Sequence, residues 1–139
     1  MTSWFLVTKK EIWDMVGSPV GHVERFFICD PKTGAKKRMA AAFDDIAVGD
    51  RVYGYVSGKG LCTILECSYT KDPRDGTIGI KKLADLPCVI TWDELKSDPI
   101  ITNCKPCRMR CRGSLFDLSA SEADAIKQVV IQKNPNLSL

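Results

Sequence analysis

Histidine is almost absent from this sequence, and its scarcity limits the chemistry that the chain can perform. His22 is the single histidine among 139 residues, and no catalytic partner stands near it in the sequence. General acid–base catalysis needs a positioned proton carrier with a tuned pKa. The GxSxG and HExxH patterns and the phosphate-binding glycine loop are missing as well. The sequence therefore favours a protein that is not an enzyme, without a cofactor.

Long apolar runs and a strong excess of charge are also lacking. No uncharged stretch is long enough to span a membrane, and the N-terminal MTSWFLVTKKE has neither the basic start nor the cleavage site of a signal peptide. The seven cysteines are an odd number and fall in strand-like runs, which favours reduced thiols. We expect a cytoplasmic protein without a membrane partner. The net charge of +3 means that any nucleic-acid site must be a local one.

The most informative stretch is a central hairpin. Residues 51–56 alternate between valine or glycine on one side and tyrosine or polar residues on the other, which is the period of a half-buried strand. Residues 57–60, SGKG, suit a hairpin turn. The strand that follows is apolar on both sides down to Ile64, so it should lie in the middle of its sheet. Tyr53 and Tyr55 form an aromatic wall beside the turn.

Three capping-box spacings, at Thr8, Thr91 and Ser119, predict helices over residues 8–16, 91–98 and 119–133. Further strands are predicted at residues 4–7, 24–29, 35–42, 77–83 and 88–90. Strands outnumber helices, and their links have hairpin length. We therefore expect one domain over residues 1–139, an α+β fold with a strongly curved, mostly antiparallel sheet or small pseudo-barrel and two or three covering helices.

The stretch from Cys104 to Arg112 allows two interpretations. Cys104, Cys107 and Cys111 have metal-ligand spacing, and His22 or Cys88 could complete a zinc site. Alternatively, residues 107–112 alternate sulfur-bearing and arginine side chains, which a strand would sort into a buried and an exposed face. The strand interpretation explains more residues without a fourth ligand, so we expect no metal. Its arginine face is a candidate for phosphate contacts.

Several stretches in this order resemble the EVE domains of the PUA-like superfamily, which are relatives of the YTH RNA readers. The stretches are Ser3–Thr8, Glu11–Trp13, Ile46–Tyr55, Leu86-Pro87, Thr91–Lys96 and Arg112–Ser119. The resemblance implies a PUA-like curved sheet and a non-catalytic domain that binds a modified base by flipping it into an aromatic-walled pocket. It favours methylated DNA, and implies the specificity module of a modification-dependent restriction system with a fused or associated NTPase motor and nuclease.

By position, the resemblance places the modified-base pocket at the end of the first strand, in the segment before residue 24 and in the central hairpin. The implied pocket residues are Thr8, Lys10, Trp13, Gly21, His22, Val23, Tyr55, Ser57, Gly58 and Tyr69. Glu24 and Arg25 stand where YTH readers carry a tryptophan. The expected contacts to the nucleic-acid backbone are Lys36, Lys37, Arg38, Arg108, Arg110 and Arg112.

Other functions stay open from the sequence. An RNA-binding or RNA-processing accessory domain of the PUA-like type is the main alternative. A small metalloprotein built on the three cysteines is another. The last is an enzyme that acts on a small molecule or nucleotide and uses Lys10 or His22 in the same cleft.

Overall fold

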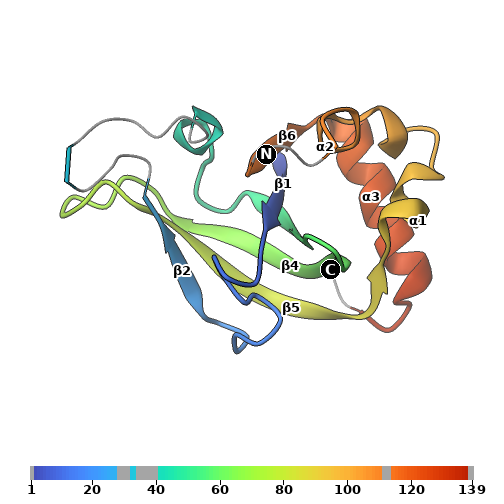
Figure 1. Ribbon diagram of the computed structural model, residues 1–139, viewed down its shortest axis with the longest axis horizontal. Helices are drawn as coiled ribbons and strands as arrows, with labels where there is room; N and C mark the ends of the chain where they lie inside the picture. The colour runs from blue at the N-terminus through green and yellow to red at the C-terminus, as the bar shows by residue number, and fades with distance from the viewer. Residues whose placement is uncertain (1, 28–31, 34–40, 111–113, 138–139) are drawn as a thin grey trace.

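The computed structural model describes residues 2–27, 32–33, 41–110 and 114–137. Its six strands form one sheet in the order β2-β5-β4-β3-β1-β6. β1 runs parallel to β3, and the other neighbouring strands are antiparallel. The strands are β1 (Ser3–Thr8), β2 (Val23–Phe26), β3 (Arg51–Val56), β4 (Gly60–Tyr69), β5 (Ile78–Ile90) and β6 (Leu115–Leu118). The sheet curls strongly, so the predicted α+β fold with a curved, mostly antiparallel sheet is confirmed (Figure 1).

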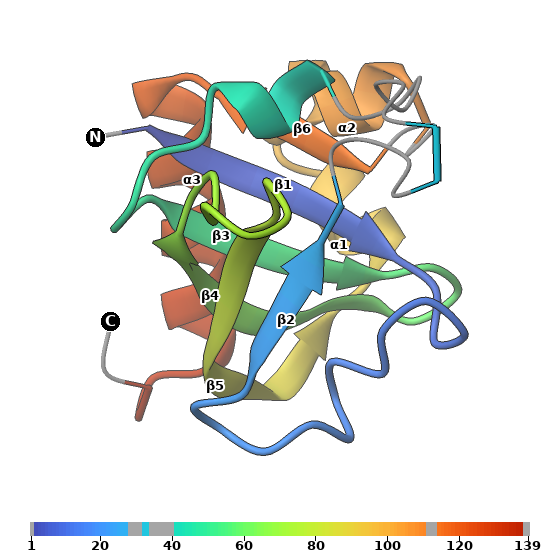
Figure 2. The ribbon, with the colours of Figure 1, turned by 90° about the vertical axis from the view of Figure 1, so that its left-hand side faces the viewer.

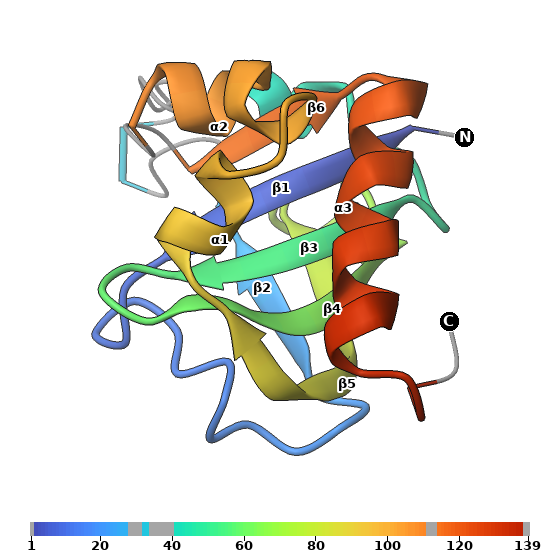
Figure 3. The same ribbon diagram turned by 90° about the vertical axis from the view of Figure 1, so that its right-hand side faces the viewer.

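Three α-helices and two 3-10 turns complete the described fold. They are η1 (Ala41–Asp44), α1 (Trp92–Lys96), η2 (Ile101–Asn103), α2 (Lys105–Arg108) and α3 (Ala120–Lys133). α1 and α3 cover one face of the sheet (Figure 3). Because the sheet curls, its edge strand β2 and the segment before β2 lie over the opposite face (Figure 2). In this described part, no helix is long and apolar enough to cross a membrane.

Strict alternation along β1 and β3 divides the core into two clusters. Trp4 and Leu6 enter the cluster on the β2 side, whereas Phe5 and Val7 enter the cluster beneath the helices. Because side chains of a strand alternate between faces, the residues of β3 divide in the same way. The predicted central hairpin is confirmed, and β4 lies between β3 and β5 as expected.

The predicted strands around residues 77–90 form one element. Leu86-Pro87 does not interrupt β5, which runs for 13 residues. Its pairing with β4 shifts register at three points, and such irregularities bend a strand and increase its twist. The predicted division into two strands, residues 77–83 and 88–90, is therefore wrong, because the bulged strand β5 accommodates Pro87 without ending.

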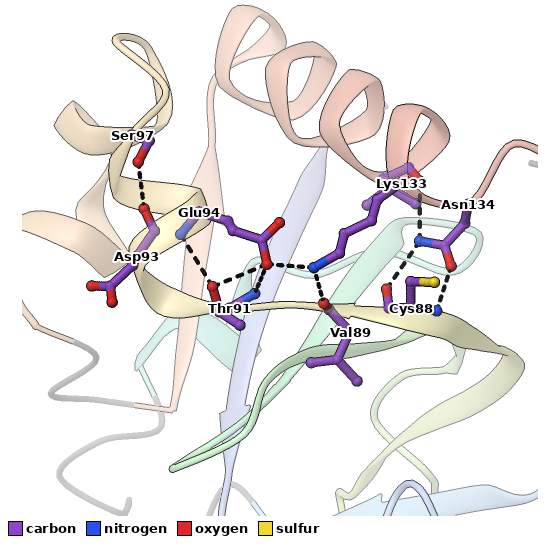
Figure 4. Close-up of polar contacts among 9 residues, drawn as sticks. Cys88, Val89, Thr91, Asp93, Glu94, Ser97, Lys133 and Asn134 are labelled. Carbon is purple, nitrogen blue, oxygen red and sulfur yellow. Dashed lines mark hydrogen bonds and ion pairs between the residues drawn. The ribbon is translucent and has the colours of Figure 1, made fainter.

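Two of the three predicted capping boxes begin helices. The Thr91 hydroxyl accepts a hydrogen bond from the Glu94 N–H, and Ser119 does the same with Glu122. The Glu94 carboxylate also pairs with Lys133, whose ammonium donates to the Val89 carbonyl at 2.7 Å (Figure 4). These contacts join α1, the end of α3 and β5.

The helix predicted over residues 8–16 is wrong, because Thr8 ends β1 and residues 9–16 form turns and irregular structure. Trp13 and Met15 are both buried, while Ile12 and Val16 are exposed, which is not the pattern of a helix face. The backbone carbonyls of this loop bond to the buried ammonium of Lys82, which lies 2.7 Å from the carbonyl oxygens of Met15 and Ser18 and 3.2 Å from that of Val16. Lys82, which is distant in the sequence, therefore donates hydrogen bonds to backbone carbonyls that a helix would have paired with its own N–H groups.

Two further strand predictions need correction. β2 ends at Phe26 and does not include residue 27, whereas residues 28–29 of the predicted strand lie outside the described residues. The described end of the predicted return strand, residues 41–42, belongs to the 3-10 turn η1, and residues 35–40 lie outside the described residues.

Candidate functional site

A pocket of about 260 Å³ opens where β1 ends beside β2. We call it the phenylalanine pocket. Its lining is Leu6, Val7, Thr8, Ile12, Glu24, Arg25, Phe26, Phe27, Phe43 and Ser114. The rings of Phe26 and Phe43 stack with centroids 5.6 Å apart and planes 21° apart. The pocket therefore has an aromatic wall, formed by residues from β2 and η1.

Thr8 is the predicted pocket residue that lines this pocket. It is the last residue of β1 and is 3% exposed. Its backbone carbonyl accepts a hydrogen bond from the Ser57 N–H at 2.9 Å. Its hydroxyl oxygen is buried and has no hydrogen-bond partner among the described residues. A buried, unpaired hydroxyl costs about 1–3 kcal/mol, so a ligand that bonds to it gains an interaction that the free protein lacks.

Two charged residues of β2 stand at the edge of the pocket. The Glu24 carboxylate contacts His22 Nε2 at 2.9 Å. Arg25 pairs with Asp75, and its guanidinium carbon lies 6.0 Å from the centroid of the Phe27 ring. Both charged groups of this lining are therefore engaged in pairs within the chain, Glu24 with His22 and Arg25 with Asp75.

An aromatic cluster supports the pocket from outside its lining. The Trp13 ring lies 6.0 Å from His22 and 6.1 Å from Phe26, centroid to centroid, and its indole N–H donates to the Ser18 hydroxyl at 2.9 Å. Trp13 is 5% exposed. Through Phe26, the buried Trp13 fixes one wall of the pocket.

Tyr69 of β4 and Val23 of β2 lie on the two strands that flank β5. A methyl group added at Gly79 would come within 2.2 Å of the Tyr69 ring and 2.8 Å of Val23, so both side chains pack over this glycine. The Tyr69 hydroxyl lies 3.3 Å from that of Thr77. These residues border β2 but do not line the phenylalanine pocket.

A second, more open cleft of about 520 Å³ lies beneath α1, and we call it the tyrosine cleft. It is lined by Tyr55, Ser57, Gly58, Trp92, Lys96, Cys107 and Arg110. The Tyr55 and Trp92 rings meet edge to face at 6.0 Å, and the Lys96 ammonium lies 5.9 Å from the Trp92 centroid. The tyrosine cleft is thus aromatic and cationic.

The structure separates the expected pocket residues into groups. Thr8 aligns with Val56 and Tyr55 with Val7, so alternation sends Thr8 and Tyr55 to opposite faces of the sheet. Tyr55, Ser57 and Gly58 meet in the tyrosine cleft, whereas His22 and Val23 lie with the Trp13 cluster and β2. Lys10 is exposed in the turn after β1. A role of these residues in binding stays a prediction.

The expected backbone contacts divide in a similar way. Arg108 and Arg110 are exposed, and Arg110 lines the tyrosine cleft. Lys36, Lys37, Arg38 and Arg112 lie outside the described residues. The strand predicted over residues 107–112 is wrong, because residues 105–108 form α2 with Pro106 in its first turn, where proline favours a helix.

The cysteine segment does not show the metal arrangement in its described part. Among the described residues, no group of three or more potential ligands is arranged to hold a metal ion. Cys104 and Cys107 lie one helical turn apart, and Cys111 is outside the described residues. His22 has Glu24 as its neighbour, and the backbone of Cys88 is paired by the Asn134 side chain (Figure 4).

Sequence reasoning missed the residues that form the aromatic wall. Phe26, Phe27 and Phe43 were not predicted to line the pocket, although Phe26-Phe27 follows shortly after Val23, the last residue of the segment that the resemblance assigned to the pocket. An adjacent aromatic pair at the end of a short strand could have indicated this wall. Phe43 could not be found, because η1 reaches the pocket only through the tertiary fold.

Comparison with known proteins identifies the fold. No protein-family model and no curated protein sequence matches this chain. Rpa0253 from Rhodopseudomonas palustris is 19% identical, covers 100% of this chain and 97% of its own, and has a TM-score of 0.70. The DUF55 domain of human thymocyte nuclear protein 1 is 14% identical, covers 92% of this chain and 98% of its own, and has a TM-score of 0.67.

This chain has the DUF55 fold. A further solved example of the DUF55 fold, human THYN1 in complex with DNA containing 5-methylcytosine, is 14% identical with a TM-score of 0.65 and covers 94% of this chain and 98% of its own. The expected PUA-like architecture is thereby confirmed at the level of the fold.

Proposed function

We propose that this chain is a non-catalytic reader of a modified base in nucleic acid, with methylated cytosine in DNA as the favoured ligand. The observation that best supports this proposal is the buried Thr8 hydroxyl, which has no hydrogen-bond partner among the described residues and belongs to a pocket with an aromatic wall. A solved protein of the same fold is in complex with DNA that contains 5-methylcytosine. We place the modified base in the phenylalanine pocket.

Base flipping accounts for the shape of the pocket. Extruding a base costs a few kcal/mol, and stacking on aromatic side chains returns about 1–3 kcal/mol per base. Phe26 and Phe43 supply stacking surface, and the Thr8 hydroxyl supplies a hydrogen bond to the base edge. A methyl group on the base would pack against Leu6 and Ile12, which line the same pocket. Burial of that methyl group would favour the modified base over the plain one.

The phosphate backbone would be bound by cations outside the pocket. Such contacts position the strand, whereas the pocket specifies the base. Arg108 and Arg110 are exposed and suited to this role, and the same role is proposed for Lys36, Lys37, Arg38 and Arg112. The proposal extends to a specificity module of a modification-dependent restriction system that works with an NTPase motor and a nuclease.

Two variants test whether the base binds in the phenylalanine pocket or in the tyrosine cleft. In Phe26→Leu the ring is replaced by a smaller apolar side chain, whereas Tyr55→Phe removes one hydroxyl from the tyrosine cleft. Binding of methylated and plain duplexes is measured for both variants at one salt concentration, since affinity depends steeply on salt. We expect Phe26→Leu to reduce the preference for methylated DNA about tenfold, equivalent to about 1.4 kcal/mol, and Tyr55→Phe to preserve it.

Two other outcomes would change the proposal. Loss of the preference for methylated DNA in Tyr55→Phe alone would place the base in the tyrosine cleft. Preferential binding of single-stranded RNA would favour the RNA-binding alternative.

A further inference from the structure

Cys104 and Cys107 lie close together at the start of α2, and the proposed binding of a modified base does not involve the contact between their thiols. In the sequence Cys104-Lys105-Pro106-Cys107, Cys104 is the N-cap residue of α2 and Cys107 lies three residues later in its first turn. The Arg108 N–H donates to the Cys104 carbonyl at 3.0 Å, which closes the helical turn. Helix geometry puts Cα atoms three residues apart at about 5 Å, within the roughly 4.4–6.8 Å that a disulfide spans.

The two thiols differ in access. Cys104 is fully buried, while Cys107 is partly exposed and lines the tyrosine cleft. The Cys107 thiol hydrogen-bonds to the Cys104 sulfur, and this contact lowers the pKa of Cys104 to about 7. Cys67 shows the opposite behaviour, because burial raises the pKa of its thiol to about 11. Reactivity should therefore concentrate in the Cys104–Cys107 pair, since the thiolate is the nucleophile.

The charges around Cys107 determine which small molecules could react with its thiol. Lys96 and Arg110 line the same cleft, and their positive charges favour an anionic reactant. Lys105 is engaged elsewhere, since its ammonium lies 2.6 Å from the Asp117 carboxylate. The cleft of about 520 Å³ can admit a small molecule beside Cys107.

We propose that Cys104 and Cys107 form a reversible dithiol–disulfide pair whose oxidant is a carboxylate-bearing, low-molecular-weight disulfide. Cys107, deprotonated by the Cys104 thiolate to which it is hydrogen-bonded, attacks one sulfur of the oxidant, which forms a mixed disulfide at Cys107 and releases one thiolate that takes up this proton. The Cys104 thiolate then attacks the Cys107 sulfur, which forms the Cys104–Cys107 disulfide and releases the second thiolate. Two protein thiols are oxidised, one small disulfide is reduced to two thiols, and the two protons from the protein pass to the released thiolates.

Peptide mapping tests the pair directly. Trypsin does not cut between Lys105 and Pro106, so residues 97–108 form one peptide that contains Cys104 and Cys107 and no other cysteine. The full chain is treated with oxidised glutathione, alkylated and digested. We expect this peptide to become lighter by two hydrogen atoms and to resist alkylation, and dithiothreitol to restore both thiols.

Single substitutions separate the two steps. Cys104→Ser should accumulate a mixed disulfide at Cys107, whereas Cys107→Ser should leave Cys104 unmodified because it is buried. Cys88→Ser, at an exposed site outside the pair, is the matched control and should not alter the product. A lasting mixed disulfide in the wild-type chain, a link from this peptide to Cys111, or copurified zinc that blocks both thiols would overturn the proposal. The wild-type peptide map distinguishes these products even if a variant fails to fold.

Discussion

The Lys82 ammonium lies 2.7 Å from the backbone carbonyl oxygen of Met15, a residue 67 positions earlier in the chain. The side chain of Lys82 is fully buried, and its ammonium also pairs with the Asp85 carboxylate at 2.7 Å. This lysine thus anchors the loop between β1 and β2 to the central part of β5. The same loop carries Trp13, which packs on the Phe26 wall of the phenylalanine pocket.

Lys82→Met should destabilise the fold by about 2–4 kcal/mol, because the loop carbonyls lose their donor inside the protein. Urea unfolding measures the change. Lys81→Met is the matched control, since Lys81 is the neighbouring residue of β5 and is partly exposed. An equal, small effect of both substitutions would show that the loop does not depend on Lys82.

The hydroxyls of Thr8 and Thr77 should respond to valine in opposite directions. Thr8→Val removes a buried hydroxyl without a partner among the described residues and should stabilise the free protein by about 1 kcal/mol. Thr77→Val removes a hydroxyl that donates to the Asp75 carboxylate at 2.7 Å and should destabilise it by about 1–2 kcal/mol. Urea unfolding of both variants checks the two signs.

The binding consequence of Thr8→Val follows from the proposed function. If the hydroxyl bonds to the base edge, the stabilised variant should discriminate less between methylated and plain duplexes. A variant that is both more stable and equally selective would remove Thr8 from the base pocket.

Stability should depend on pH through Glu94. Hydrogen bonds from Lys133 and from the Thr91 backbone hold the pKa of this carboxyl below its ordinary value of 4.5. The unfolded chain then binds more protons than the folded one as pH falls, so the contribution is present above pH 4.5 and is lost as pH falls through the lowered value. A variant without the Glu94 carboxylate should therefore lack this contribution to the pH dependence of stability.

Thermal unfolding from neutral pH to about pH 3 measures the effect. Glu94→Gln should lower the melting temperature at neutral pH and lose less of it on acidification than the wild type. Asp93→Asn, at an exposed position of the same helix, is the control and should follow the wild-type curve. Parallel curves for wild type and Glu94→Gln would contradict the assignment.

The parts of the fold that depend on neighbours in sequence were predictable. The hairpin of β3 and β4 and the capped helices α1 and α3 follow from alternation and from side-chain caps within three residues. The loop that holds Trp13 was not predictable, because Lys82 lies far along the chain. The helical turn at Pro106 was predictable in principle from the place that proline takes in a first turn.

The candidate site was predictable only in part, for a geometric reason. The sequence shows that Tyr55 lies opposite the valines of its own strand, but it does not show the register of β1 against β3. That register pairs Val7 with Tyr55 and so turns Thr8 to the other face. The phenylalanine pocket then takes its wall from Phe26 and Phe43, which meet only in the folded chain.

The most direct test of the reading function is a binding titration with matched duplexes at one salt concentration. The duplexes are unmodified, methylated on cytosine, hydroxymethylated on cytosine and methylated on adenine. We predict that the cytosine-methylated duplex binds about tenfold tighter than the unmodified one, which corresponds to about 1.4 kcal/mol. Equal, salt-sensitive affinity for all four duplexes would contradict the proposed function and leave a general phosphate-binding surface.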